Sequence, residues 1–104
     1  MEPSHYKVLF DALPWQKVAE GLRSKTVQFG GKRLRLLEYA QQFVEPDWCE
    51  KGHAGLVLKG ELEVDFQGRK VCFPEGSGLF IPAGEKHKGR TVTPGVLLFL
   101  VEDI

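Results

Sequence analysis

Glycine and proline interrupt this sequence so often that only short regular segments fit between them. The 104 residues include 12 glycines and 6 prolines. The clearest segment, residues 61–66, alternates acidic and apolar side chains, so as a strand it would bury Leu62, Val64 and Phe66 on one face. Short alternating segments separated by turn residues are typical of an all-β sandwich or barrel.

Other segments fit the same interpretation. Gln67 and Gly68 would form a tight turn into a return strand over residues 69–73, which predicts a β-hairpin. Only residues 11–20 favour a helical turn, and Pro14 and Gly21 would keep it short. The remaining expected strands are residues 33–39, 56–58, 78–81 and 96–101.

The last expected strand, residues 96–101, is apolar on both faces. A strand with one face toward the interior and one toward water does not need this pattern. The second face therefore needs cover from outside the barrel, either from the segment around Phe10 and Trp15 or from a second subunit. We expect a homodimer, because an uncovered apolar patch would favour aggregation.

The composition is that of one ordinary globular domain. Hydrophobic residues make up 42% and charged residues 27%, with 14 basic and 14 acidic side chains. This balance gives no field that would attract nucleic acid or an anionic membrane. No run approaches ~18 apolar residues, and the first residues lack the basic region of a signal peptide. We expect a cytoplasmic protein whose two cysteines are free thiols or metal ligands.

Four side chains form a candidate metal site. Asp47, Cys49 and His53 share one parity, so on an extended strand they would leave by the same face. His87 follows a Pro-x-Gly turn and would supply a second imidazole from a distant strand. Such a mixed set suits Zn²⁺ first, with Fe²⁺ or Ni²⁺ as alternatives, whereas Mg²⁺ and Ca²⁺ prefer oxygen ligands.

The spacing around these residues resembles the cupin superfamily. Gly76, Pro82, Gly84 and His87 match the second cupin motif, and Gly60 fits the glycine that closes the first. Counting back from Gly60 puts His53 where cupins carry a glutamate. Cys49 and Asp47 stand at the positions of the two histidines of that motif, and Thr91 replaces an asparagine that commonly completes the second motif.

The resemblance implies a jelly-roll β-barrel with a divalent metal at its mouth, and it also favours a dimer. We therefore expect a single cupin domain over residues 1–104, with its motifs within about residues 46–91 and residues 1–25 packing on or extending the barrel. The predicted function is binding of, or action on, a small molecule beside a metal held by Asp47, Cys49, His53 and His87.

Each candidate ligand also has a structural interpretation. Asp47 would suit a turn cap, and Cys49 a buried small apolar side chain. His87 would suit a hydrogen-bonded position at a turn, and His53 a position at the barrel mouth in contact with solvent or a small molecule. No separate general base stands out, so the sequence leaves catalysis undecided. The alternatives are a non-enzymatic barrel that binds or senses a small molecule or metal, and a metal-free β-barrel.

Overall fold

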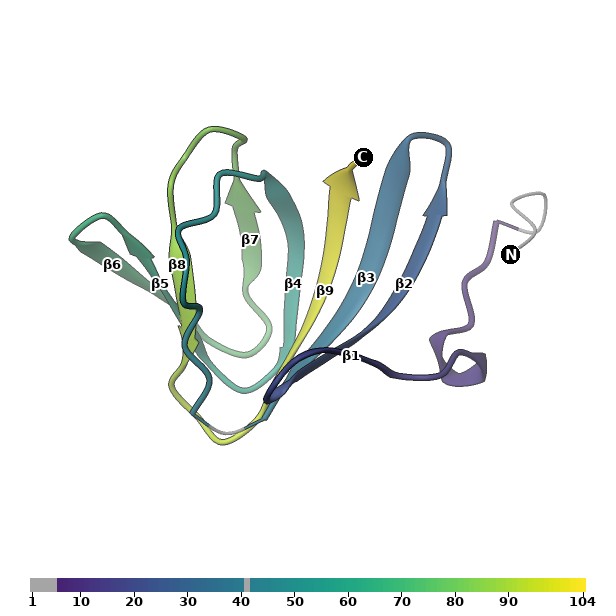
Figure 1. Ribbon diagram of the computed structural model, residues 1–104, viewed down its shortest axis with the longest axis horizontal. Helices are drawn as coiled ribbons and strands as arrows, with labels where there is room; N and C mark the ends of the chain where they lie inside the picture. The colour runs from purple at the N-terminus through teal and green to yellow at the C-terminus, as the bar shows by residue number, and fades with distance from the viewer. Residues whose placement is uncertain (1–5, 41) are drawn as a thin grey trace.

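The computed structural model describes residues 6–40 and 42–104, which form two antiparallel β-sheets facing each other (Figure 1). The larger sheet has the strand order β1-β2-β3-β9-β4-β7, and the smaller sheet has the order β6-β5-β8. The strands are β1 (Gln16–Ala19), β2 (Leu22–Phe29), β3 (Lys32–Tyr39), β4 (His53–Lys59), β5 (Leu62–Phe66), β6 (Arg69–Phe73), β7 (Gly78–Ile81), β8 (Lys88–Thr91) and β9 (Val96–Asp103).

This architecture confirms the all-β prediction, including its clearest hairpin. β5 and β6 pair through the turn at Gln67 and Gly68, whose φ angles are 58° and 103°. Positive φ at both central residues gives the tight turn whose twist matches that of paired strands. β7 has the expected bounds, and β9 continues two residues beyond the predicted strand.

The N-terminal part differs from the expectation of a helical turn over residues 11–20. A 3-10 helix covers only Phe10–Ala12, and Gln16–Ala19 form β1 at the edge of the larger sheet. Pairing with β2 overrides the weak local helical preference, because it satisfies backbone groups that a helix ended at Pro14 would leave free. β2 and β8 were not predicted. Residues 1–5 of the expected N-terminal segment lie outside the described residues.

The core lies between the sheets, and β9 is its central strand. Val96, Leu98 and Leu100 point inward and are at most 4% exposed. On the outer face, the ring of Phe10 packs against Phe99 with 6.1 Å between centroids, and Lys25 Nζ donates to the Phe10 carbonyl at 2.8 Å. The N-terminal segment therefore covers part of the second apolar face of β9, on the outer side of the sheet (Figure 1).

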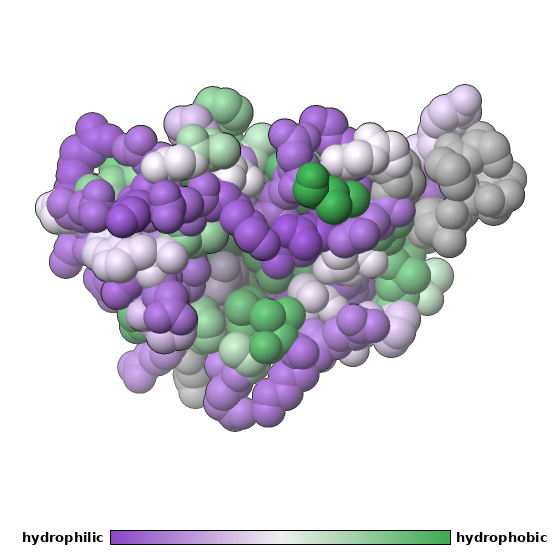
Figure 2. Space-filling model, turned by 45° about the horizontal axis from the view of Figure 1, so that its top comes forward, coloured by the Kyte–Doolittle hydropathy of each residue, from purple (hydrophilic) through white to green (hydrophobic). Residues whose placement is uncertain are grey.

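The visible surface is largely hydrophilic, with apolar side chains grouped near a hollow in the middle of the view in Figure 2. Among the described residues, the 3-10 turn is the one helical element, and none of the chain there forms a helix long and apolar enough to cross a bilayer.

β4 approaches β9 so closely at Gly55 that no side chain fits there. A Cβ atom added at Gly55 would overlap the carbonyl oxygen of Phe99. On the neighbouring strand, a Cβ added at Gly78 would be 3.7 Å from its nearest neighbour, an ordinary contact. The absence of a side chain at Gly55 is therefore required for the β4–β9 pairing.

Gly55→Ala is expected to lower the free energy of unfolding by about 2 kcal/mol or more, because the strands must separate to admit the methyl group. Gly78→Ala is the matched control and should change it by less than about 0.5 kcal/mol. Urea unfolding of the two variants checks this. Equal stability of both variants would contradict the close approach.

Candidate functional site

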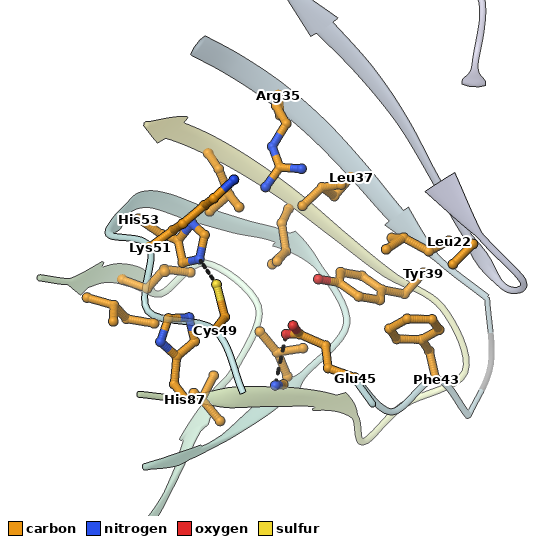
Figure 3. Close-up of a pocket in the computed structure, with 18 of the residues that line it drawn as sticks. Leu22, Arg35, Leu37, Tyr39, Phe43, Glu45, Cys49, Lys51, His53 and His87 are labelled. Carbon is orange, nitrogen blue, oxygen red and sulfur yellow. Dashed lines mark hydrogen bonds between the residues drawn. The ribbon is translucent and has the colours of Figure 1, made fainter. Parts of the chain in front are cut away.

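The space between the two sheets contains a cavity of about 410 Å³. Its polar end carries Cys49, His53 and His87 together with Arg35 and Lys51 (Figure 3). Tyr39 and Glu45 line another part of its wall. The apolar part of the lining comes from inward-facing side chains of both sheets, among them Leu22, Leu37, Phe43, Leu62, Val64, Leu79, Ile81, Leu98 and Leu100.

Cys49, His53 and His87 lie close enough to share one ion. One ligand atom from each lies within 4.8 Å of the other two. Cys49 Sγ is 3.9 Å from His53 Nε2, and the two imidazole rings are 5.1 Å apart. The sulfur points between the rings in Figure 3. Three of the four predicted ligands therefore meet in the folded chain.

Backbone pairing brings Cys49 next to His87. Their amides and carbonyls exchange two hydrogen bonds, of 2.8 Å and 2.9 Å. The Pro-x-Gly turn supports this pair, because Gly84 has a φ of +92° and its amide donates to the carbonyl of Glu50 at 2.8 Å. His53 reaches the same place as the first residue of β4.

In both His53 and His87, the ring nitrogen Nδ1 contacts an oxygen that accepts hydrogen bonds. His87 Nδ1 is 2.7 Å from the carbonyl of Glu85, and His53 Nδ1 contacts the carboxylate of Glu102. A carbonyl and an ionised carboxylate only accept hydrogen bonds, so Nδ1 carries the proton in each ring. In the neutral imidazole this leaves the lone pair on Nε2, the tautomer required of an Nε2 metal ligand.

Glu102 is the buried anchor of this arrangement. Its side chain is 2% exposed and accepts from Arg33 Nε at 3.1 Å and from Arg35 Nη2 at 2.8 Å. Burial alone would raise the pKa of Glu102. The hydrogen bonds from His53 and Arg35 outweigh burial and lower this pKa to about 2. Glu102 is therefore ionised at neutral pH and fixes the ring of His53.

Asp47 does not join the group. Residues 47–52 do not form the continuous strand that the parity argument assumed, because only Cys49 makes an isolated bridge before β4 begins at His53. Asp47 is exposed and is not among the residues that line the cavity. The alternation that predicted a common face therefore does not apply across this segment.

The sequence interpretation missed Glu102 and Arg35. The sequence did contain a signal for Glu102. Alternate residues of a strand face the same side, and Glu102 is the next alternate residue after Val96, Leu98 and Leu100, which face inward. Arg35 lies between apolar neighbours on β3, pairs with Leu100, and gave no comparable signal.

Tyr39 and Phe43 pack together elsewhere along the cavity wall, with ring centroids 5.3 Å apart. The residue Tyr39 is 6% exposed. Burial, and next the carboxylate of Glu45, raise the pKa of Tyr39 above its usual range. Glu45 Oε1 itself accepts a hydrogen bond of 2.9 Å from the amide of Gly89.

Two imidazoles and one thiol form a donor set of borderline softness. Zn²⁺ is held by such ligands, and Fe²⁺ or Ni²⁺ accept them as well. Three protein ligands leave at least one coordination position for water or a small molecule. The residues that the fold brings together therefore fit a divalent transition metal.

Comparison with known proteins identifies the fold. Residues 29–100 match the model of a family described as the AraC-like ligand binding domain. No curated protein matches the sequence. The structure is similar to KdgF from Halomonas sp., with a TM-score of 0.79, 21% identity, and coverage of 91% of this chain and 89% of that one.

Two further solved structures have the same fold. The cupin domain of Cnp3 from Schizosaccharomyces pombe has a TM-score of 0.73 and 13% identity, with 93% of this chain and 72% of that one covered. A cupin superfamily protein from Desulfitobacterium hafniense has a TM-score of 0.70 and 16% identity, with 86% and 83% covered. These similarities confirm the predicted jelly-roll barrel.

Tyr39→Phe is expected to reduce the loss of stability at alkaline pH. The folded chain holds the Tyr39 phenol in its neutral form, whereas the unfolded chain releases its proton above about pH 10. The contribution of Tyr39 to the free energy of unfolding is therefore fully present below about pH 10 and falls as the pH rises further. Urea unfolding between about pH 9 and pH 11 checks this. An equal fall in the free energy of unfolding of the wild type and of Tyr39→Phe would contradict this prediction.

Proposed function

The chain belongs to the AraC-like ligand-binding domain family of the cupin superfamily, and on that basis we propose that it binds a small molecule beside a divalent metal ion. Cys49, His53 and His87 would hold the metal. Zn²⁺ is the first candidate, with Fe²⁺ or Ni²⁺ as alternatives. The small molecule would occupy the cavity between the sheets.

The observation that carries this proposal is the common orientation of the two imidazoles. His53 and His87 each have Nδ1 bonded to an acceptor, on Glu102 and Glu85 respectively. A carboxylate or carbonyl on the remote ring nitrogen is the usual partner of a metal-bound histidine, because it fixes the tautomer and the ring. A buried structural histidine would also need such a partner, so the proposal depends as well on the convergence of both rings with Cys49, in which one ligand atom of each residue lies within 4.8 Å of the other two.

Asp47 as a fourth ligand stays a prediction. Its exposed position supports water or the small molecule in the fourth place instead. A metal with an open position also supplies a Lewis acid, so catalysis on the bound molecule is the alternative function.

Binding is favoured over catalysis by the state of the two inward carboxylates. Glu45 accepts from the amide of Gly89, and Glu102 is held by two arginines. Both oxygens of Glu102 are therefore engaged and it is not free to act as a general base, whereas Glu45 has one oxygen engaged by the Gly89 amide. A cytoplasmic location without nucleic-acid or membrane partners stays a prediction from the sequence.

Purified without an affinity tag, stripped with a chelator and reloaded, the protein should bind about one equivalent of Zn²⁺. Loading with Co²⁺ should give a thiolate-to-metal charge-transfer band in the near ultraviolet, since Cys49 would bind as the thiolate. Cys49→Ser should remove this band, and metal affinity should fall as the pH is lowered because protons compete for the ligands.

Cys72→Ser is the matched control. Cys72 is the second free cysteine, exposed on β6 and outside the group of ligands. This variant should keep both the charge-transfer band and the wild-type affinity for Zn²⁺. If the wild type takes up no metal, the protein is a metal-free barrel. If Cys49→Ser and Cys72→Ser lose metal affinity equally, Cys49 is not the ligand.

We also propose that the protein forms a homodimer through the uncovered part of its outer sheet face. Phe80 on β7 is 76% exposed and Leu56 on β4 is 39% exposed. By register, Leu56 pairs with Phe99, so these side chains continue the face that Phe10 covers only in part. A second copy would bury the same apolar patch on both subunits.

Light scattering is expected to give twice the chain mass of 11.7 kDa for the wild type. Phe80→Ser should shift the protein toward the monomer, because it removes the most exposed aromatic side chain of the patch. Val92→Ser changes a side chain that is 44% exposed beyond the end of β8 and should leave the dimer intact. A wild-type monomer at micromolar concentration would rule the dimer out.

A further inference from the structure

Tyr39 carries a hydroxyl group that has no hydrogen-bond partner among residues 6–40 and 42–104. The residue is 6% exposed and lines the cavity. In that part of the chain, Arg35 Nε is the one side-chain nitrogen or oxygen that is both unpartnered and inaccessible. The Tyr39 hydroxyl is therefore accessible from the cavity, and Figure 3 shows it pointing into this space. Buried tyrosine hydroxyls usually have a partner, so this one calls for a ligand.

Glu45 supplies a hydrogen-bond acceptor on the same part of the cavity wall. Its Oε1 accepts from the amide of Gly89 at 2.9 Å, and its own amide donates to the carbonyl of Gly89 at 3.0 Å. These two bonds fix both the backbone and the side chain of Glu45. Within the described ranges, Oε2 has no hydrogen bond and is not among the inaccessible atoms. One carboxylate oxygen is therefore held by the backbone, and the other is available to a ligand.

The Tyr39 hydroxyl and the Glu45 carboxylate lie near each other without satisfying each other. Both point into the same space between the sheets in Figure 3, and no hydrogen bond joins them in the described structure. After burial, the charge of Glu45 is the largest cause that raises the pKa of Tyr39, which places the carboxylate close to the phenol. The phenol therefore stays protonated and offers a donor, whereas Glu45 offers an acceptor.

A hydroxyl group on the ligand suits this pair, because one oxygen atom both accepts and donates a hydrogen bond. A carboxylate on the ligand could only accept, and it would face Glu45 with like charge. An ammonium group could only donate, which would leave the Tyr39 O–H without an acceptor. The rest of the lining is largely apolar, so the remaining atoms of the ligand should be apolar as well.

We propose that Tyr39 and Glu45 determine ligand specificity by binding the hydroxyl group of a small neutral alcohol, with Tyr39 as donor and Glu45 Oε2 as acceptor. The apolar body of the alcohol would lie beside Phe43, which packs against Tyr39 with 5.3 Å between ring centroids and also lines the cavity. The volume of about 410 Å³ admits such a molecule. This inference rests on the proposed function only in taking the cavity as the place where the small molecule binds.

The test titrates the zinc-loaded protein with benzyl alcohol, benzyl methyl ether, toluene and benzylamine, and follows binding by NMR chemical shifts. The four probes share an apolar ring and differ in the hydrogen bonds that they can donate or accept. Benzyl alcohol should bind the wild type about tenfold or more tightly than toluene, because toluene would leave both polar groups unpaired. The ether accepts but cannot donate, so its affinity should be lower than that of the alcohol.

Tyr39→Phe should weaken binding of the alcohol and of the ether by about tenfold, and should not weaken binding of toluene. In Glu45→Gln, the amide oxygen can keep the bond from Gly89, so an NH₂ donor replaces the free acceptor. This variant should lose the preference for the alcohol over the ether. Glu38→Gln is the matched control, because Glu38 faces the other side of β3 and pairs with Arg23 at 2.6 Å. It should leave all four affinities unchanged.

If benzyl alcohol binds no more tightly than toluene, the two groups hold water and the proposal is wrong. Tighter binding of benzylamine, or equal effects of Glu45→Gln and Glu38→Gln, would also overturn it. If Glu45→Gln does not fold, Tyr39→Phe still decides, because equal changes for the alcohol and for toluene would exclude a hydrogen bond to the phenol.

These results are separable from the proposed function. If toluene binds without any preference for the alcohol, the cavity remains a binding site and only the present inference fails. If no probe binds, the cavity is not the binding site, and this inference fails together with the small-molecule part of the proposed function. A wild type that prefers benzyl alcohol but shows no Co²⁺ charge-transfer band would overturn the metal site alone.

Discussion

β9 pairs along its length with β3 on one side and with β4 on the other, and both the core and the candidate site depend on this double pairing. Its inward positions fill the space between the sheets with Val96, Leu98 and Leu100, and the next inward position is Glu102. The same strand thus supplies the apolar centre and the buried charge. Gly55 allows the approach on the β4 side, because any larger residue would overlap Phe99.

Glu102 joins features that the sequence keeps far apart. Its carboxylate contacts Arg33 and Arg35 on β3 and His53 at the start of β4. A buried carboxylate with three cationic or hydrogen-bonding partners remains ionised, which the low pKa of Glu102 reflects. One side chain therefore holds the proposed metal ligand His53 together with the two arginines of β3, so a change at Glu102 would disturb all three.

The parts of the fold that local sequence specifies were predicted, and those that need distant partners were not. The β5–β6 hairpin follows from alternation and one tight turn, and β7 from its flanking glycine and proline. β2 has no such alternation and exists because β1 and β3 pair with it. In the site, motif spacing correctly predicted that Cys49, His53 and His87 lie near one another. Asp47 lies apart from them, because strand parity does not hold across an irregular segment, and its role as a ligand stays a prediction.

The paired backbones of Cys49 and His87 come from segments separated by the whole of β4 to β7. In the unfolded chain, bringing Cys49 and His87 together costs loop-closure entropy. The complete set of three ligands is therefore a property of the assembled sheets. An ion that binds the folded barrel and not the unfolded chain would stabilise the folded state. By mass action, the free energy of unfolding would rise as the concentration of the free ion rises.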